Sequence, residues 1–536
     1  MEMTESKYFD ELLHMSFFEP LPRSMFVENM YVMHDLIHDL AQYVSKDDCF
    51  RLEDQKLVEI PDTVRHVSVN VSRGDQIDII NKLCCYEKLR TLRFTLWCRL
   101  DLNTNNVDQL FLKLKMLRVL ELRYRGNLPG SIGDLKHLRY IDLQCNIGLQ
   151  NLPESLGNLY NLQVLSLCYC RIRELPDSIG DLKHLIHIDL EGNHGLTRLP
   201  ESLGNLYNLQ VLNLSYCCSL RMLPATMSQL VSLRHLQTDD YKLVSRIDGV
   251  GKLTGLHELQ VRGRQLRELG GMCMLRQLAV YNLEEVGSKE EAIQARLRTM
   301  ECLQVLQLEW SDRGASSIKP ELEEEVLQAL RPNKGIQVLG IRGYGGVKSP
   351  DWMEVSTLTS FSSLSCVSLE DCPNWQVPPC SFLGQLRHLE CLEIEGMPEW
   401  EEWSCPVLWD CLLELTIHDC PKLKEFPLLP PTLKSLSLNG VGISRVEEGG
   451  VETTSSLDSP PTSASCDNLT SIGWLLQQQL PDLEEIEISV CEILVSLPEK
   501  GFGHLVSLKR LRIQTHLPAA HAGRGGCLDT ASSLLT

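Results

Sequence analysis

One fourteen-residue segment occurs twice in this chain without a single change. LPESLGNLYNLQVL fills residues 152–165 and again residues 199–212, an offset of 47 residues, and a related unit lies between the copies. Two units per 47 residues is the spacing of a repeat protein, in which each unit buries its apolar face against its neighbours. The 536 residues can therefore form a continuous stack, whereas length alone would suggest several separate domains.

The repeat unit has the pattern L-x-x-L-x-x-L-x-L-x-x-N/C. Its first leucines are at positions 114, 135, 159, 182, 206 and 230, which gives steps of 21, 24, 23, 24 and 24 residues. This pattern is typical of leucine-rich repeats. The L-x-L core predicts a short strand, and the following LPxSxGxL segment returns the chain along the outer surface. We therefore predict an α/β fold, a leucine-rich-repeat solenoid whose curved parallel β-sheet has the form of a horseshoe.

The last position of the pattern accounts for many of the 21 cysteines. A small donor there can hydrogen-bond a backbone carbonyl that the turn leaves unpaired, and either an amide or a thiol can do this. The residues in this position are Asn146, Asn193, Cys170, Cys217, Cys372, Cys420 and Cys491. Because the sequence has no paired C-x-x-C sets and an odd number of cysteines, we interpret them as reduced structural thiols and predict no metal site.

Charge and hydropathy restrict the partners. The 51 basic and 71 acidic residues give a formal net charge of −20, which opposes a nucleic-acid or anionic membrane partner. The acidic start, MEMTESKYFDELLHM, does not resemble a secretory signal, and no uncharged apolar run reaches the roughly 18 residues of a membrane span. We therefore predict a cytoplasmic protein that has no membrane span and binds no nucleic acid.

Outside the regular repeats, the pattern becomes irregular. Residues 320–331 predict a helix that begins with proline and has acidic residues near its N-terminus. Segments without periodic apolar residues are predicted to be disordered. The predicted division is 1–50 for a short helical remnant, 51–113 for a linker and the first irregular repeats, 114–250 for regular repeats, 251–515 for irregular repeats with a disordered loop at 444–467, and 516–536 for a disordered tail.

The N-terminal segment YVMHDLIHDLAQYVS, residues 31–45, carries two His-Asp pairs four positions apart. On a helix, His34 and His38 would share one face, as in some metal-dependent hydrolases. The apolar positions Met33, Leu36, Ile37, Leu40 and Val44 form a stripe opposite the His-Asp side chains. Because a metal site needs further ligands, we favour an amphipathic helix that docks on another surface.

The same region resembles a known family. YFDELLHMSFFEP at 8–20 and Met33-His34-Asp35, which matches the family's MHD signature, are similar to the C-terminal end of the winged-helix region in the nucleotide-binding (NB-ARC) domain of plant immune receptors. Further matches are TVRHVSV at 63–69, IRGYGGVKSPDWM at 341–353 and LGQLRHLECLEIEGMPEWEEW at 383–403. In this order, the motifs resemble NB-ARC leucine-rich-repeat (NLR) disease resistance proteins of the coiled-coil type, of which the chain would be a C-terminal fragment.

This resemblance implies a role for the MHD motif. In the family, the histidine contacts a phosphate of ADP and helps to hold the receptor closed, so His34 would be the nucleotide sensor, with Met33 and Asp35 completing the motif. The family's G-x-x-x-x-G-K-[ST] phosphate loop does not occur in these residues. We therefore expect no cofactor to bind this chain alone, whereas the full-length family binds ADP or ATP.

The implied function lies in innate immunity. The repeats would recognise a pathogen effector or a modified host protein, and contacts with the NB-ARC domain would keep the receptor autoinhibited. A repeat surface without an assembled catalytic site favours a binding protein and not an enzyme. Two alternatives stay open, an F-box-type ubiquitin-ligase substrate receptor and a generic intracellular leucine-rich-repeat scaffold. Alternation around the strand leucines predicts the following protein-binding residues on the concave face: Tyr140, Asp142, Gln144, Val164, Ser166, Tyr169, His187, Asp189, Val211, Asn213 and Tyr216.

Overall fold

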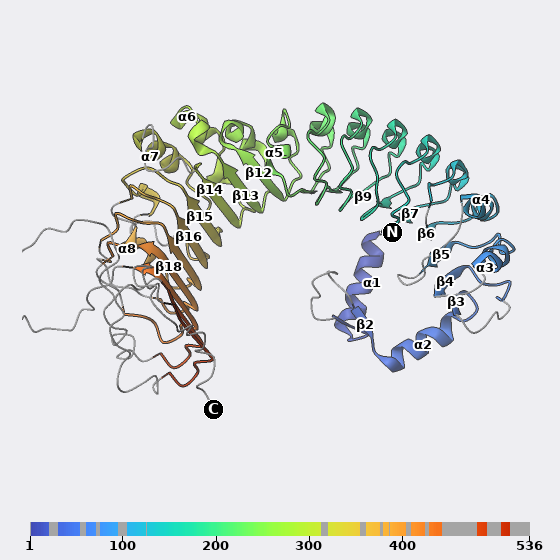
Figure 1. Cartoon of the computed structure of the whole chain (residues 1–536), viewed down its shortest axis with the longest axis horizontal. Coiled ribbons are helices and arrows are strands. Elements are labelled where there is room, and N and C mark those ends of the chain that lie inside the picture. The colour runs from blue at the N-terminus through green and yellow to red at the C-terminus, as the bar shows by residue number, and fades with distance from the viewer. Residues whose placement is uncertain are drawn as a thin grey trace, which may run out of the picture. The chain divides into compact units, whose positions relative to one another are not determined.

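The computed structural model of the chain consists of two compact units, Met1–Asp248 and Gly249–Thr536 (Figure 1). The loop predicted at 444–467 and the tail predicted at 516–536 lie outside the described residues. The structure describes residues 2–20, 31–53, 60–70, 76–94, 104–124, 126–311, 320–353, 361–375, 379–384, 386–401, 403, 409–423, 428–441, 480–489 and 505–514.

The first unit begins with two helices and a small antiparallel sheet. The elements are α1 (Glu2–His14), β1 (Phe18–Pro20), β2 (Tyr31–Met33) and α2 (Asp35–Ser45), and β1 pairs with β2. Phe9 of α1 stacks on Phe18, with 5.2 Å between the ring centroids, and meets Tyr31 edge-on at 5.1 Å. These aromatic contacts attach α1 to the two strands.

Nine parallel strands then form the main sheet of the first unit, and they follow one another in chain order. Each strand is short because only the L-x-L core of a repeat is extended. The stack begins at β3, before the regular repeats. The strands are β3 (Cys49–Glu53), β4 (His66–Asn70), β5 (Thr91–Phe94), β6 (Val119–Glu121), β7 (Tyr140–Asp142), β8 (Val164–Ser166), β9 (His187–Asp189), β10 (Val211–Asn213) and β11 (His235–Gln237).

In most repeats of the first unit, a short helical segment returns the chain from one strand to the next. In the regular repeats, a proline with extended backbone, such as Pro153 at φ −73°, precedes each return, which is a 3-10 helix. The α-helical returns are α3 (Gln76–Leu83), α4 (Thr104–Lys113) and α5 (Tyr241–Val244). The 3-10 returns are η1 (Gly130–Asp134), η2 (Glu154–Asn158), η3 (Asp177–Asp181), η4 (Glu201–Asn205) and η5 (Ala225–Gln229).

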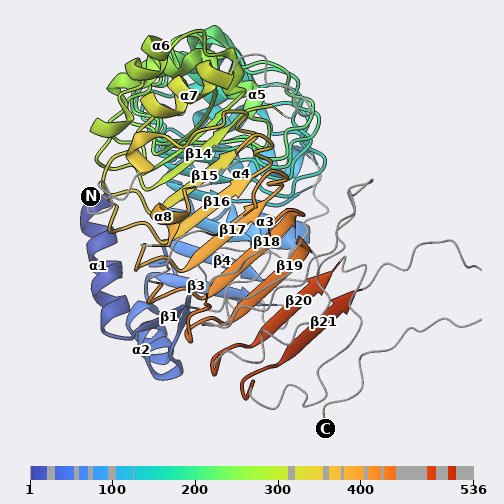
Figure 2. The same cartoon turned by 90° about the vertical axis from the view of Figure 1, so that its left-hand side faces the viewer.

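The second unit contains a ten-stranded parallel sheet, again in chain order (Figure 2). Its strands are β12 (Glu258–Arg262), β13 (Gln277–Tyr281), β14 (Val305–Glu309), β15 (Val338–Arg342), β16 (Cys366–Glu370), β17 (Cys391–Glu395), β18 (Glu414–Cys420), β19 (Ser435–Val441), β20 (Glu485–Ser489) and β21 (Arg510–Gln514). Its helical segments are η6 (Val250–Lys252), η7 (Gly263–Gly271), η8 (Leu283–Glu285), α6 (Lys289–Gln294), η9 (Leu297–Thr299), α7 (Pro320–Ala329), η10 (Asp351–Met353) and α8 (Cys380–Leu383).

These parallel sheets with helical returns confirm the predicted leucine-rich-repeat fold. The repeat leucines fill the interior, and Leu135, Leu138 and Leu143, for example, are fully buried. The helix predicted at 320–331 is α7, which begins at Pro320.

The last position of the repeat pattern has the predicted structural role. Asn193 is fully buried and its amide donates to the carbonyls of Leu167 and Leu190 at 2.9 and 2.8 Å. Cys217, in the next repeat, donates its thiol to the carbonyl of Leu190 at 3.2 Å. Burial raises the pKa of Cys217 to about 11, so this thiol keeps its proton for the bond. Asparagine and cysteine thus link consecutive turns in the same way, whereas Cys491 lies outside the described residues.

Glycine in the LPxSxGxL segment is required by close contact between successive returns. A Cβ atom on Gly157 would lie 2.6 Å from both the Cβ and the carbonyl oxygen of Ser178 in the next repeat. Gly180 has the same relation to Ser202, at 2.7 and 2.5 Å. The missing side chain therefore sets the spacing of the outer layer.

We predict that Gly157→Ala lowers the free energy of unfolding by about 1–3 kcal/mol, because the added methyl group must push two returns apart. Gly130→Ala is the matched control, since its Cβ would lie 3.9 Å from its nearest neighbour, Ser155 Oγ, and it should leave stability unchanged or slightly higher. Chemical denaturation followed by circular dichroism would compare the two variants. Equal stabilities would contradict the packing argument.

Candidate functional site

The strand register of the first unit places equivalent side chains in two lines across the sheet. The residues flanking each buried strand centre lie on the opposite face from the leucine core, since successive side chains alternate. The first line consists of Val119, Tyr140, Val164, His187, Val211 and His235. The second consists of Arg93, Glu121, Asp142, Ser166, Asp189, Asn213 and Gln237. We call these residues the strand-face ladder.

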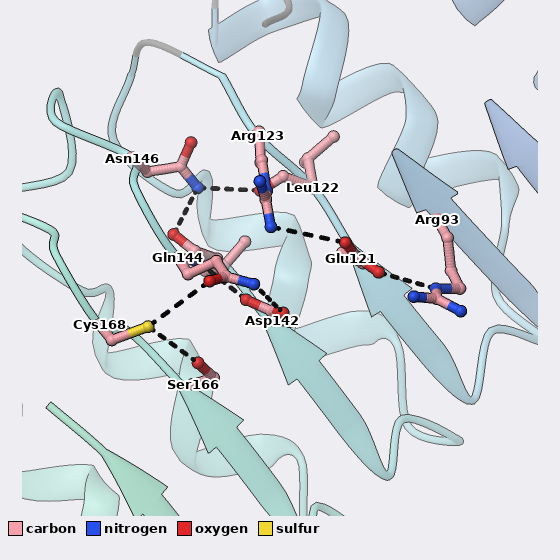
Figure 3. A network of polar contacts seen from close by, with 10 residues as sticks. Arg93, Glu121, Leu122, Arg123, Asp142, Gln144, Asn146, Ser166 and Cys168 are labelled. Carbon is pink, nitrogen blue, oxygen red and sulfur yellow. Dashed lines mark hydrogen bonds and ion pairs between the residues drawn. The ribbon is translucent and has the colours of Figure 1, made fainter. Parts of the chain in front are cut away.

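The N-terminal half of the ladder is a charged network (Figure 3). Arg93 Nε lies 2.7 Å from Glu121 Oε2, and the other carboxylate oxygen lies 3.6 Å from Arg123 Nη2. Arg123 is only 5% exposed, and neither its Nε nor its Nη2 has a hydrogen-bond partner among the described residues. Glu121 therefore supplies the opposite charge that makes burial of this guanidinium tolerable.

Next to this pair, Asp142 is buried and held by one neighbour. Its two carboxylate oxygens accept hydrogen bonds from the backbone and side-chain nitrogens of Gln144, both at 2.9 Å (Figure 3). The amide oxygen of Gln144 in turn accepts from the thiol of Cys168 at 3.8 Å. The network therefore passes from one repeat to the next through side chains that follow the strands.

Burial shifts the titration of four ladder residues, and one effect is that it raises the pKa of Tyr140 to about 12. Desolvation is the main cause that raises the pKa of Asp142 and of Asp189, and the nearby carboxylates Glu121 and Glu191 add to the effect. Desolvation also lowers the pKa of His187, although Asp189 opposes this. The lowered pKa favours the neutral form of His187 at pH 7, so this histidine adds little positive charge to the centre of the ladder.

Two exposed tyrosines lie beside the C-terminal half of the ladder. Tyr169 donates its hydroxyl to Glu191 Oε1 at 2.5 Å, and Glu191 Oε2 accepts from the amide of Asn213 at 3.2 Å. Hydrogen bonding to Glu191 is the main cause that raises the pKa of Tyr169 to about 12. The ring of Tyr169 also covers Gly192, where a Cβ atom would lie 2.5 Å from it. Tyr169 is thus a neutral, positioned phenol, 47% exposed, and Tyr216 is 52% exposed.

The predicted protein-binding residues differ in their environments. Asp142 and Asn213 are buried and hold local backbone, whereas Tyr169 and Tyr216 are exposed. The other predicted residues, half-buried on the same face, are Tyr140, Gln144, Val164, Ser166, His187, Asp189 and Val211. Sequence reasoning missed Arg123, Cys168 and Glu191, which follow their strands at the same repeat position as Gln144. An alignment of the repeats would have found these residues, because each lies two positions after the end of its strand, as Gln144 does.

The structure corrects one part of the helix prediction for residues 31–45. Met33 ends β2 and His34 is the N-cap of α2, so neither is inside the helix. Residues 31–33 pair with β1 as a strand, so the helix predicted for residues 31–45 begins later than the sequence pattern suggests. His34 Nδ1 accepts from the backbone nitrogen of Leu36 at 3.4 Å. In the neutral ring the proton is therefore on Nε2, which leaves a donor suited to an anion.

The apolar stripe on α2 is exposed in the part of the chain that the structure describes. Leu36, Leu40 and Val44 are 73%, 55% and 74% exposed. His38 contacts Gln42, with 3.2 Å between the side-chain nitrogens, and its Nδ1 lies 3.8 Å from Asp39. Within the described residues, no group of three or more His, Cys, Asp and Glu side chains is arranged to hold a metal ion. None of the described helices has the length and apolar character needed to cross a membrane.

Three family models match parts of the chain. The disease resistance protein winged-helix domain matches residues 1–41, a leucine-rich repeat region matches 100–196, and the R13L1/DRL21 leucine-rich repeats match 266–397. The winged-helix match covers α1, β1, β2 and the start of α2. It therefore favours the immune-receptor interpretation of this segment over the F-box alternative.

Curated relatives extend the similarity over most of the chain. A disease resistance protein of Arabidopsis thaliana is 31% identical over an alignment of 508 positions, which covers 86% of this chain and 33% of that protein. Disease resistance protein RGA1 of Solanum bulbocastanum is 31% identical over an alignment of 537 positions, which covers 96% of this chain and 44% of that protein. RPP13-like protein 1 of Arabidopsis thaliana is 29% identical, and the alignment covers 95% of this chain and 49% of that protein. The chain thus spans between a third and a half of the length of these relatives.

Solved structures include distant matches. A leucine-rich-repeat protein of Leptospira interrogans is 20% identical, with a TM-score of 0.43, over 76% of this chain and 93% of its own. The plant peptide hormone receptor RGFR1, in complex with RGF2, is 17% identical, with a TM-score of 0.42, over 87% of this chain and 80% of the receptor chain.

The fold and the strand-face ladder define a leucine-rich-repeat protein, a class that presents extended surfaces to protein partners. The N-terminal match and the curated relatives agree on one kind of protein. Residues 1–41 match the winged-helix domain of disease resistance proteins, and most of the chain is similar to plant disease resistance proteins, a resemblance that the sequence motifs predicted.

We predict that Asp189→Asn raises the free energy of unfolding at pH 7, on the order of 0.5 kcal/mol because solvent screens part of the charge. Asparagine can keep the bond in which Asp189 Oδ1 accepts from the Glu191 backbone at 3.1 Å, as Asn213 does with Ser215 at 3.0 Å one repeat later. The pKa of Asp189 is raised, so its charge opposes folding at high pH. The gain should therefore shrink as pH falls through that pKa toward 3.8.

Urea unfolding at several pH values would measure this dependence. Asp177→Asn, a change to an exposed carboxylate in the same repeat, is the control and should show no comparable gain. A loss of stability for Asp189→Asn at pH 7 would show that its charge supports the fold.

Proposed function

We propose that this chain is a recognition module in plant defence that binds a pathogen effector or a host protein modified by one. The module acts by binding, without catalysis, and works in the cytoplasm. The observation that carries this proposal is the strand-face ladder, where in-register strands present polar side chains beside two exposed tyrosines, Tyr169 and Tyr216. The similarity to disease resistance proteins supports the biological setting.

The two tyrosines suit a protein interface. Aromatic side chains bury large areas at a small entropic cost, and tyrosine adds a hydroxyl, so tyrosines are frequent among the residues that dominate binding energy. Tyr169 is already fixed by Glu191 and Gly192, which lowers the cost of ordering it on binding. The surface around the two tyrosines is negatively charged, because Glu191 lies beside Tyr169 and the carboxylate of Asp239 accepts a hydrogen bond from the Tyr216 backbone nitrogen.

The test compares two tyrosine pairs that are equally exposed but lie on different surfaces. Tyr160 and Tyr207 are 52% and 51% exposed, and each lies under a lysine of the preceding repeat, Lys136 or Lys183. We expect the double variant of Tyr169 and Tyr216 to alanine to lose its partner, with affinity reduced at least about tenfold, and the Tyr160 and Tyr207 variant to keep it.

The measurement is affinity purification from pathogen-infected leaf tissue, followed by titration of each recovered partner against the wild-type chain and both variants. A partner that binds the Tyr169 and Tyr216 variant as tightly as the wild type would place recognition elsewhere. Loss of binding in the control pair alone would assign recognition to the surface around Tyr160 and Tyr207.

We also propose that the MHD motif regulates the receptor when the nucleotide-binding region is present, and that the repeats help to keep it autoinhibited. His34 is exposed at the N-terminus of α2, and its Nε2 proton is suited to a phosphate oxygen of ADP. The positive end of the helix dipole at the same place also favours an anion. Asp35 begins the helix and completes the motif.

For this role we predict that Asp35→Val, in the chain fused to the nucleotide-binding region of a closely related receptor, causes cell death in leaves without an effector. Asp39→Val is the matched control, because Asp39 is an exposed carboxylate one turn later on α2. The control should stay silent, and the unfused Asp35→Val chain should trigger nothing. A fused Asp35→Val receptor that stays silent but responds to its effector would reject the switch role.

A further inference from the structure

Two cysteines occupy facing positions on neighbouring strands of the second unit. Cys366 begins β16 and Cys391 begins β17, and the parallel pairing sets them opposite each other, Cα to Cα. Val367 and Leu392, the next residues, are buried in the core. By alternation both thiols lie on the other face of the sheet, where they are half-buried and accessible from solvent.

The spacing of the strands is compatible with a bond between the two sulfur atoms. Neighbouring strands are about 4.7–4.9 Å apart, and disulfides join Cα atoms about 4.4–6.8 Å apart. Cys366 and Cys391 already lie within hydrogen-bonding distance of each other. A disulfide can therefore form without rearrangement of the backbone.

The two thiols differ in reactivity. The hydrogen bond from Cys391 is the main cause that lowers the pKa of Cys366, against burial and the charges of Glu393 and Glu414. The same hydrogen bond raises the pKa of Cys391. Cys366 is thus the sulfur that carries the negative charge first, and the thiolate is the reactive form. By contrast, burial raises the pKa of Cys372, on the same strand turn, to about 12.

We propose that Cys366 and Cys391 form a modification site that peroxide converts to a reversible disulfide. The Cys366 thiolate attacks one oxygen of hydrogen peroxide, so that an S–O bond forms, the O–O bond breaks and hydroxide leaves to become water. Cys391 then loses its proton and attacks the oxidised sulfur. The S–S bond forms, the S–O bond breaks and a second water leaves. Two thiols are oxidised, one peroxide is reduced, and a dithiol reverses the change.

This disulfide would join two consecutive repeats across the surface of their sheet. The linked strands are each held to their neighbours by the same parallel ladder, so the bond adds a covalent constraint to β16 and β17. Because both sulfur atoms are accessible from solvent, a dithiol can reach the bond and reduce it. The site is independent of Tyr169, Tyr216 and the function proposed for them.

The test is peroxide treatment of the purified, reduced full chain, followed by alkylation, proteolysis and mass spectrometry. Cleavage after Glu370 separates Cys366 from Cys372, and cleavage after Glu390 and Glu393 isolates Cys391. We expect a cross-linked peptide pair that has lost two hydrogen atoms and that dithiothreitol restores. Its formation should be about tenfold faster than oxidation of Cys372.

The variants separate the roles of the two sulfurs. In Cys391→Ser, dimedone should trap a sulfenic acid on Cys366, because the resolving thiol is missing. In Cys366→Ser, Cys391 should stay reduced under the same treatment. The proposal is overturned if both thiols of the folded wild-type chain remain alkylatable after peroxide, or if Cys366 couples to a different cysteine. The wild-type measurement decides this even if a serine variant fails to fold.

Discussion

The backbone hydrogen bonds between consecutive repeats hold the rest of the structure in place. A strand of three residues cannot exist alone. Each inner strand of the two parallel sheets lies between two others; Leu167 N, for example, donates to Asp189 O at 2.8 Å and Leu190 N to Asn213 O at 2.9 Å. In several repeats, a buried asparagine or cysteine after the strand donates a hydrogen bond to a backbone carbonyl that the strand pairing leaves without a partner. Each repeat therefore depends on its neighbouring repeats for its backbone hydrogen bonds as well as for its apolar core.

This constraint also builds the functional surface. Because the strands pair in register, equivalent positions of different repeats become neighbours, and a surface forms from residues about 24 positions apart in sequence. The same proximity has a cost, since it brings carboxylates together and removes them from water. Asp142 and Asp189 show this effect in their raised pKa values. The hydroxyl of Tyr169 bridges to Glu191 and so connects the ladder to an exposed aromatic ring.

The repeat period made the strands, the buried leucines and the asparagine and cysteine bonds predictable, because each follows from local pattern and simple hydrogen-bond demand. Other features depend on contacts that a pattern does not contain. Asp142 alternates as a surface residue, yet neighbouring repeats bury it. Met33 fits a helical stripe, yet pairing with β1 draws it into a strand. Glu191 was missed because it lies beyond the L-x-L core, although its repeat position matches that of Gln144.

The close approach of Gly157 to Ser178 has a consequence for how such chains change over generations. Each junction between returns needs only a small residue on one side and a serine or threonine on the other, as Gly204 and Thr226 show again. A crossover that inserts or removes the 47-residue unit between the two identical segments leaves matching junctions at both ends. The outer layer is therefore interchangeable, so recombination can lengthen the array and bring new side chains onto the strand face without redesigning the core.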